Sequence, residues 1–203
     1  MSARLYVEGG GDRREQQAPL RQAFATLLDK AGFRRPRAPA IVCAGSRNQA
    51  FREFSNALKA HGDAALLLVD AEDAVDGTPW DHVRRRDGWV RPDSASDDQL
   101  HLMVQMMENW FLCDRSMLAG YFGSGFGERH LPGAEHDVES LNKQRVAEGL
   151  RMSTRSSQKR EYGKGAHSAD LLARLDPERL RRAAPHFDKL LAALSARLPQ
   201  GNR

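Results

Sequence analysis

An uninterrupted apolar run at 64–69 ends directly in Asp70, and this feature most constrains how the chain can fold. A short, continuously apolar run is typical of a strand that is buried on both faces of a parallel sheet. The run is far shorter than the roughly 20 residues that a membrane-spanning helix requires. We therefore expect a central buried strand, helices over both faces of its sheet, and no membrane partner.

Short strands and helices alternate along the first half of the chain. Strands are predicted at 4–7, 40–43 and 64–69, with a fourth at 100–106. Apolar residues at helical spacing fill the intervals 15–31 and 49–60. This order predicts an α/β fold, Rossmann-like, whose mostly parallel sheet has about four strands and helices on both faces.

The second half of the chain is predominantly helical. Helices are predicted at 143–150, 168–175, 177–184 and 185–198. We expect residues 1–125 to form the α/β core and residues 126–203 to form a helical C-terminal region. This region would contain the basic segment 151–167 and pack on the core as one domain.

Composition and cysteine usage indicate a cytoplasmic globular protein. Of the 203 residues, 40% are hydrophobic and 29% are charged, as in soluble globular domains. The first residues, MSARLYVEGGGD, contain no apolar core of a signal peptide, so secretion is not expected. Cys43 and Cys113 lie far apart in apolar settings, which favours buried thiols in a reducing compartment.

The net charge of +4 is concentrated in one short segment, 151–165. Its basic residues are Arg151, Arg155, Lys159, Arg160 and Lys164. Glu161 is the acidic residue that stands among them. A local positive patch on an otherwise balanced chain indicates an anionic partner, such as RNA or DNA held through its phosphates. The alternative is a solvated loop without a ligand.

Acidic residues follow two of the predicted strands. Glu8 ends the first strand and Asp12 follows three glycines later, while Asp70 and Glu72 follow the third strand. Because right-handed crossovers bring the ends of parallel strands to one edge, we expect these carboxylates to converge. Clustered carboxylates favour Mg²⁺ or Mn²⁺, which commonly serve phosphodiester cleavage. The alternative is that they form turns and caps, with Asp12 capping the next helix.

Three further residues are candidates for catalysis. Glu108 lies in an apolar helical run, so its carboxylate would be buried as a metal ligand, as a proton-transfer group, or in a structural pair with an arginine. Lys164 stands between two glycines and could offset charge on a phosphate. His167 precedes a helix expected to begin near Ser168, where it would move a proton, contact phosphate, or simply start the helix.

Several motifs resemble one known group of proteins. The segments 7–12 and 68–73 resemble the two acidic motifs of TOPRIM domains. The segments 104–114 and 162–168 narrow the resemblance to a small bacterial TOPRIM-like family, similar to the nuclease half of the overcoming-lysogenization-defect proteins. The likeness extends from residue 4 to the neighbourhood of residue 195. Some members of this family act as toxic effectors beside an ABC-type ATPase in PARIS anti-phage systems.

The resemblance implies a TOPRIM-like sheet and a set of metal ligands. In TOPRIM nucleases the first-strand glutamate and a later acidic pair hold divalent metal, which implies Glu8, Asp70 and Glu72 here. Asp12 matches the second acid of the related nuclease motif. The family pattern is Asp-x-Asp, whereas this chain has Glu72 at the second position, so Asp73 remains an alternative ligand.

We therefore expect a nuclease that uses Mg²⁺ or Mn²⁺ to cleave RNA or DNA, acting as a toxic anti-phage effector with an ATPase partner. Glu8 would also serve as general base, and Glu108, Lys164 and His167 would assist. One alternative is a non-catalytic module that regulates or assembles with an ATPase. Another is a phosphohydrolase of small nucleotides, which a cramped pocket without a groove along 151–164 would favour. A homodimer through 110–122 or the last helix also stays open.

Overall fold

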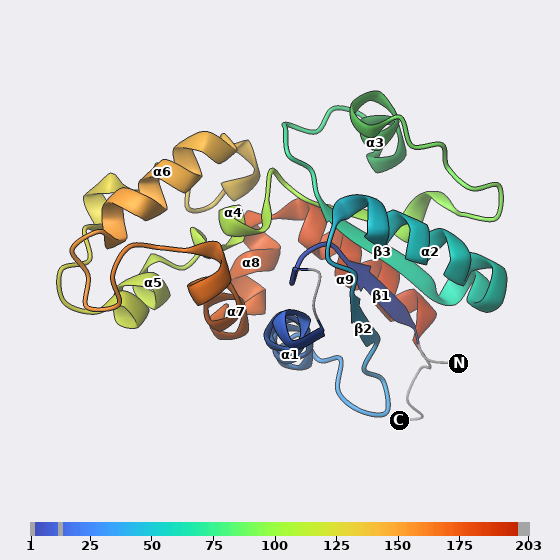
Figure 1. Ribbon diagram of the computed structural model, residues 1–203, viewed down its shortest axis with the longest axis horizontal. Coiled ribbons are helices and arrows are strands. Elements are labelled where there is room, and N and C mark those ends of the chain that lie inside the picture. Colours follow the sequence, from blue (N-terminus) through green and yellow to red (C-terminus); the bar gives the residue numbers. More distant parts are fainter. Residues whose placement is uncertain (1–2, 12–13, 199–203) are drawn as a thin grey trace.

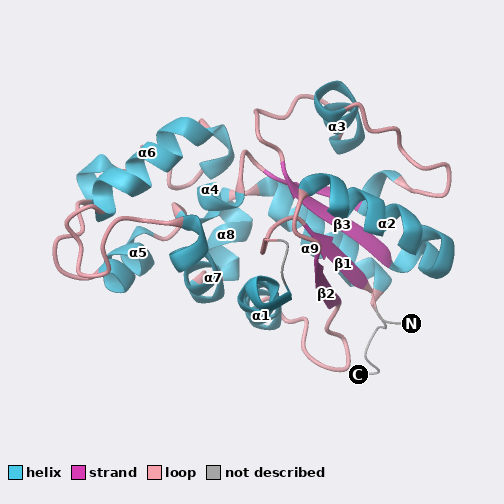
Figure 2. Ribbon diagram, in the orientation of Figure 1, coloured by secondary structure: helices cyan, strands magenta, loops and turns pink. Residues whose placement is uncertain are grey.

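The computed structural model describes residues 3–11 and 14–198 and contains one four-stranded sheet. All neighbouring strands pair in parallel, in the order β2-β1-β3-β4. Figures 1 and 2 show β2, β1 and β3 side by side. The strands are β1 (Arg4–Val7), β2 (Ala40–Cys43), β3 (Ala65–Asp70) and β4 (Leu100–Met103). The predicted α/β fold with about four mostly parallel strands is therefore confirmed.

The central strands bury both of their faces. Every residue of β3 is buried, as its continuously apolar sequence predicts. Leu66 and Leu68 face one hydrophobic cluster, whereas Leu67 and Val69 face the other. This alternation is the geometry of a strand, whose successive side chains point to opposite faces.

Helices cover both faces of the sheet (Figure 2). The helices α1 (Arg14–Lys30) and α9 (Pro185–Arg197) contribute to the cluster on one face. The helices α2 (Arg47–His61) and α3 (Pro79–Asp87) contribute to the cluster on the other face. The sequence prediction of a doubly covered sheet is therefore confirmed.

The strand order reverses at β1. The chain places β2 on one side of β1, crosses back through α2, and places β3 on the other side. Val7, the last residue of β1, consequently pairs with Leu68 of β3. Ligands of open α/β sheets bind beyond the strand ends at such a reversal, so the acidic residues after β1 and β3 stand at a favourable place.

The fourth strand is shorter than the sequence predicts. It ends at Met103, whereas the apolar run continues to Met106. Beyond Met103 the backbone still pairs with the segment after β3, because the N–H of Glu72 donates to the carbonyl of Gln105 over 2.6 Å. The chain then turns away from the sheet and begins a helix at Met107.

The remaining helices lie beside the carboxyl ends of the strands. They are α4 (Met107–Phe111), α5 (Arg115–Phe122), α6 (Lys143–Thr154), α7 (Lys164–Arg174) and α8 (Pro177–Ala183). Trp110, Phe122 and Leu171 of this region are buried in the same cluster as Leu5 of the sheet. A continuous core supports packing of the helical region on the sheet, and the boundary at residue 125 stays a prediction.

Two helices extend further into the basic segment than predicted. The helix α6 continues to Thr154, and α7 begins at Lys164 rather than near Ser168. The side chain of His167 explains the earlier start, because its Nδ1 accepts a hydrogen bond from the Gly163 N–H over 3.0 Å. That bond satisfies a backbone donor that the first turn of a helix leaves open.

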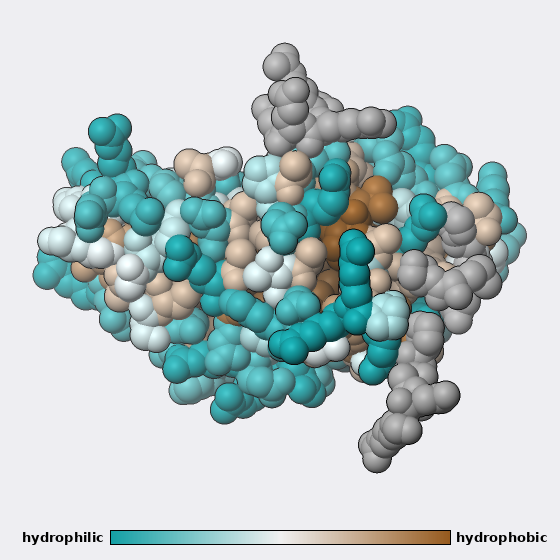
Figure 3. All heavy atoms as spheres, turned by 90° about the horizontal axis from the view of Figure 1, so that it is seen from below, coloured by the Kyte–Doolittle hydropathy of each residue, from teal (hydrophilic) through white to brown (hydrophobic). Residues whose placement is uncertain are grey.

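The surface is mainly polar. Figure 3 shows hydrophilic side chains over most of one face, with a hydrophobic patch near its middle. Within residues 3–11 and 14–198, no helix is long and apolar enough to cross a membrane.

Candidate metal centre

Three carboxylates meet at the ends of β1 and β3. Glu8 directly follows β1, Asp70 ends β3, and Glu72 lies two residues further along. Each offers an oxygen atom, and these atoms all lie within 4.8 Å of one another. The structure thus brings together three of the four carboxylates that the sequence predicts to converge. Asp12, the fourth, lies outside the described residues.

The alternative ligand Asp73 lies apart from this group. Its side chain is 69% exposed and pairs with Arg86, 3.7 Å away. Glu72 has the unusual backbone instead, with a φ of 70°, in the left-handed region that glycine favours. A non-glycine residue held in this region commonly marks a functional position, and here the turn directs Glu72 toward Glu8 and Asp70.

Glu8 is oriented by two donors on one of its oxygens. The backbone N–H of Asp70 donates to Oε2 over 3.1 Å, and Nη1 of Arg47 donates to the same atom over 3.2 Å. Oε1 accepts no hydrogen bond within the described residues. Burial raises the pKa of Glu8, although Arg47 opposes the shift. Glu8 therefore presents one unengaged oxygen with increased proton affinity.

Arg47 is itself held in place from two sides. Its Nε and Nη2 donate to the carboxylate of Asp87 over 2.9 and 2.7 Å, and its guanidinium lies 4.9 Å from the ring centre of Trp89. The same guanidinium also donates to the backbone carbonyl of Asp70. The sequence analysis missed this residue. The sequence did offer one indication of Arg47, because a basic side chain in the first turn of a helix is disfavoured by the helix dipole.

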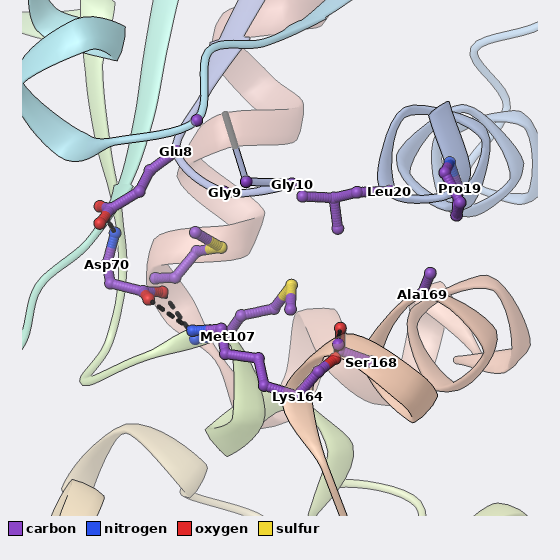
Figure 4. A pocket seen from close by; sticks show the side chains of 14 residues that line it. Glu8, Gly9, Gly10, Pro19, Leu20, Asp70, Met107, Lys164, Ser168 and Ala169 are labelled. Atoms are coloured by element: carbon purple, nitrogen blue, oxygen red, sulfur yellow. Dashed lines mark hydrogen bonds and ion pairs between the residues drawn. The ribbon is translucent and has the colours of Figure 1, made fainter. Parts of the chain in front are cut away.

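Asp70 is the most buried acid of the group. Its Oδ1 accepts the backbone N–H of Met107 over 2.8 Å, and its Oδ2 lies 3.5 Å from Nζ of Lys164 (Figure 4). Burial raises its pKa to about 7, with Lys164 lowering it and the carboxylates of Glu8 and Glu108 raising it further. A nearby positive charge would therefore stabilise the ionised form of this carboxyl group.

A second lysine, Lys143, neutralises the charge of Glu72. Nζ of Lys143, at the start of α6, lies 2.7 Å from Oε2 of Glu72. Burial alone would raise the pKa of Glu72, but the hydrogen bond and charge of Lys143 outweigh it, so the pKa lies below its ordinary value. Lys143 was also missed from sequence, since nothing in the local pattern at 143 indicates a distant carboxylate.

Glu108 joins the group from the helical region. Its side chain is only 4% exposed, as the apolar run around it predicts. The hydroxyl of Tyr162 donates to Oε1 over 3.0 Å, and Oε2 lies 3.5 Å from Nζ of Lys164. Oε2 is buried without a hydrogen-bond partner among the described residues. The structural pair therefore involves a tyrosine and a lysine, not the arginine that the sequence suggested.

Lys164 bridges two acids and stands apart from the other basic residues of its segment. Burial lowers its pKa, but the carboxylates of Asp70 and Glu108 outweigh this effect and raise it overall. Arg151 instead pairs with Glu148, and Lys159 lies 4.7 Å from the ring centre of Tyr121. Arg155 and Arg160 are exposed. The predicted nucleic-acid-binding set thus divides into Lys164, at the carboxylates, and four residues on the α6–α7 connection and its flank.

His167 does not join the carboxylates within the described residues. It lies in the first turn of α7, where its ring contacts Tyr121, Phe122 and Tyr162. Its Nδ1 is occupied by the N–H of Gly163. These contacts favour the structural alternative, a residue that starts the helix, over a catalytic role.

A cavity of about 510 Å³ adjoins the carboxylates. Figure 4 shows Glu8, Asp70 and Lys164 at one end and Leu20 and Ala169 at the other. Lys164 is the only one of the five predicted nucleic-acid-binding residues in the lining described for this cavity. The cavity therefore lies between α1 and α7 and reaches Glu8 and Asp70 of the centre.

The donor set suits one hard divalent cation. Glu8, Asp70 and Glu72 provide oxygen atoms alone, which Mg²⁺ and Mn²⁺ prefer over softer ligands. Oε1 of Glu8 and Oε1 of Glu72 are free of hydrogen bonds within the described residues. A bound cation would also offset the burial and the repulsion by neighbouring carboxylates that together raise the pKa of Asp70. These residues can hold a metal ion beside a cationic side chain, which is an arrangement suited to phosphate chemistry.

Comparison with known proteins places this site within a family. The model of the family described as Domain of unknown function (DUF4276) matches residues 7–195. No curated protein and no solved structure matches the chain. The matched range includes all the carboxylates described above and also Lys164. The chain belongs to the DUF4276 family.

Proposed function

We propose that the protein is a divalent-metal-dependent hydrolase of phosphodiester bonds in RNA or DNA, a nuclease of the TOPRIM type. The observation that carries the proposal is the convergence of Glu8, Asp70 and Glu72 within 4.8 Å, with Lys164 at 3.5 Å from Asp70. The sequence resemblance to TOPRIM motifs supports it independently, because it identifies the same three acids.

The residues of the site divide the work in this proposal, and Glu8 has two tasks. Glu8, Asp70 and Glu72 hold the ion, and a bound divalent ion supplies Lewis acidity to the phosphate. Glu8 also accepts a proton from the attacking water, through the oxygen that accepts no hydrogen bond among the described residues. Lys164 offsets negative charge on the phosphoryl oxygens. A bond forms from the water oxygen to phosphorus, one phosphorus–ester bond breaks, and the leaving oxygen takes up a proton.

The biological setting is proposed from the resemblance. It comprises a toxic effector of anti-phage defence, an ABC-type ATPase partner and a cytoplasmic location. Cys43 and Cys113 are both buried and free, which fits a reducing compartment. For the proposed homodimer, Trp110, Phe111 and Phe122 are buried within one chain, so other residues would have to form its interface.

A second candidate function has a specific observation in its favour. The cavity at the metal centre includes Lys164 but none of Arg151, Arg155, Lys159 or Arg160 in its described lining. A cavity whose described lining lacks the rest of this basic segment favours a phosphohydrolase that acts on small nucleotides. Such an enzyme would use the same carboxylates on a phosphate ester of one nucleotide.

Nuclease assays with Mg²⁺ or Mn²⁺ test the proposal. We expect the wild-type protein to cleave RNA or DNA, and Glu8→Ala and Asp70→Ala to lose that activity. Asp73→Ala is the matched control, because this neighbouring carboxylate is exposed and should leave cleavage intact. Toxicity or ATPase binding that is unchanged in Glu8→Ala and Asp70→Ala would support a non-catalytic interaction module instead.

A further inference from the structure

The cavity beside the metal centre is much larger than a metal ion needs. Its volume of about 510 Å³ falls within the range of roughly 300–1,000 Å³ that is usual for sites binding organic ligands. The acidic centre occupies only one end of this space (Figure 4). The remaining volume therefore requires an explanation of its own.

The other walls of the cavity are apolar. They include Leu20 from α1, Met103 and Met107 from the sheet edge and α4, and Ala169 from α7. Methionine side chains are polarizable and make favourable contacts with flat aromatic groups. A ligand whose phosphate lies at the charged end would therefore place a largely apolar group against these walls.

The glycine turn after β1 forms a further wall from backbone alone. Gly9 and Gly10 have φ values of 115° and 87°, in the region that side chains disfavour. A Cβ atom on Gly9 would lie 3.0 Å from Cδ2 of Leu20, and one on Gly10 would lie 3.0 Å from Cα of Gln17. Glycine at these positions lets the turn pass close to α1 and keeps side chains out of the space.

We infer that this cavity receives one unpaired nucleoside next to the phosphate held at the metal centre. The inference rests on the proposed function and specifies its substrate class. A base within a duplex is paired and stacked, and it must leave the stack to enter a cavity that lies between two helices. The protein therefore acts on single-stranded nucleic acid, or on a free nucleotide, in preference to duplex.

The pocket has few means of distinguishing one base from another. Ser168 is the hydroxyl side chain in the described lining, and its Oγ already donates to the carbonyl of Lys164 over 2.5 Å. The methionines adapt to different ring shapes because their side chains are flexible. We accordingly expect the four bases to bind with similar affinity.

Filling the cavity tests the inference. Ala169→Leu adds a side chain at the apolar end, and Gly165→Leu adds one at an exposed position of the lining. A Cβ on Gly165 meets nothing within 4 Å, and leucine is the better helix former, so this second variant should fold. Ala166→Leu is the control, because Ala166 is exposed on the same helix and lies outside the described lining.

The measurement is equilibrium binding of a labelled single-stranded oligonucleotide, its duplex, and a nucleoside monophosphate, each with Ca²⁺ present. We expect single strand to bind at least about tenfold tighter than duplex, and both filled variants to lose about tenfold or more in affinity. Ala166→Leu should match the wild type. A monophosphate that binds as tightly as the strand, and loses affinity in the filled variants, would identify the free nucleotide as the source of the nucleoside.

Two results would overturn the inference. They are equal affinity for duplex and single strand, and unchanged ligand affinity in both Ala169→Leu and Gly165→Leu. Calorimetric titration of Mn²⁺ into the same proteins separates this failure from failure of the proposed function. Normal Mn²⁺ uptake with unaffected nucleic-acid binding by the filled variants would contradict the nucleoside pocket alone, whereas no uptake by the wild type would contradict the metal centre itself.

Discussion

Asp70 places a titratable carboxyl group inside the molecule, at the end of a strand with no exposed residue. Its oxygens face the Met107 N–H and the Lys164 ammonium, and two further carboxylates act on it from Glu8 and Glu108. Burial and these acids together keep a proton on Asp70 up to a pH of about 7. The metal-free protein consequently stores unfavourable charge at this residue above that pH.

The stability of the metal-free protein should depend on pH through Asp70. Its pKa rises from the ordinary 3.8 to about 7 on folding, so the folded chain keeps a proton that the unfolded chain releases. This contribution to stability is fully present below pH 3.8 and is lost as pH rises through about 7, at up to about 1.4 kcal/mol per unit. Urea unfolding in EDTA measures this dependence. Across this pH range, the free energy of unfolding should fall less for Asp70→Asn than for the wild type.

Asp73→Asn serves as the control for this pH dependence. Asp73 is 69% exposed, so its replacement should leave the slope of the wild type unchanged. Identical slopes for the wild type and Asp70→Asn would contradict the assignment of the shift to Asp70.

Arg47 should matter to activity although it is not a catalytic residue. It positions Glu8 while its other nitrogens bind Asp87, and lysine cannot reproduce this fork of donors. We expect Arg47→Lys to lower metal affinity or cleavage by about 10- to 100-fold, as is usual for residues that orient metal ligands. Arg52→Lys, on an exposed position of the same helix, should retain both.

A readout besides activity distinguishes positioning by Arg47 from a general loss of structure. Far-ultraviolet circular dichroism of Arg47→Lys should match the wild type while its Mn²⁺ affinity falls. Full metal affinity in a folded Arg47→Lys protein would show that Arg47 does not orient Glu8.

At the scale of elements, α4 and the start of α7 bring the helical region to the sheet edge. Glu108 of α4 is buried between the Tyr162 hydroxyl and the Lys164 ammonium, and both of these partners lie at or just before the start of α7. The first turn of α7 is therefore tied to the metal centre through side chains, not only through hydrophobic packing. Weakening these side-chain contacts should lower the stability of the protein and also alter the position of Lys164.

Tyr162→Phe tests this connection. It removes the hydroxyl that donates to Glu108 and leaves a buried carboxylate oxygen unpaired, at an expected cost of about 1–3 kcal/mol in the free energy of unfolding. Tyr121→Phe is the matched control, since the Tyr121 hydroxyl donates to the exposed Asp170 and its loss should cost less. If urea denaturation shows the same loss in the free energy of unfolding for Tyr162→Phe and Tyr121→Phe, a structural role for the Tyr162–Glu108 bond is contradicted.

The elements differ in how well their limits could be predicted. The strands β1 and β2 end where the sequence places them, because glycine-containing turns interrupt the apolar runs. The start of α7 was misplaced because its first turn is stabilised by the His167 side chain, a contact that apolar periodicity does not report. The length of β4 was overestimated because an apolar run does not distinguish a strand from the start of the next helix.

At the scale of the whole molecule, the sheet topology makes the site predictable in part. The convergence of Glu8 and Asp70 follows from parallel strands whose ends share one edge. The topology does not predict that Arg47 and Lys143 contact these carboxylates, because they lie 39 and 71 positions away from them in the sequence. Only tertiary packing determines which distant cation reaches which acid.

Calorimetric titration of Mn²⁺ into the wild-type protein, Glu8→Gln and Asp70→Asn tests the central claim most directly. Asp73→Asn completes the set as an exposed neighbour that should bind like the wild type. The shared carboxylate centre predicts saturable uptake by the wild type and Asp73→Asn and its loss in Glu8→Gln and Asp70→Asn. Uptake that is absent in the wild type, or equal in all four proteins, would contradict it.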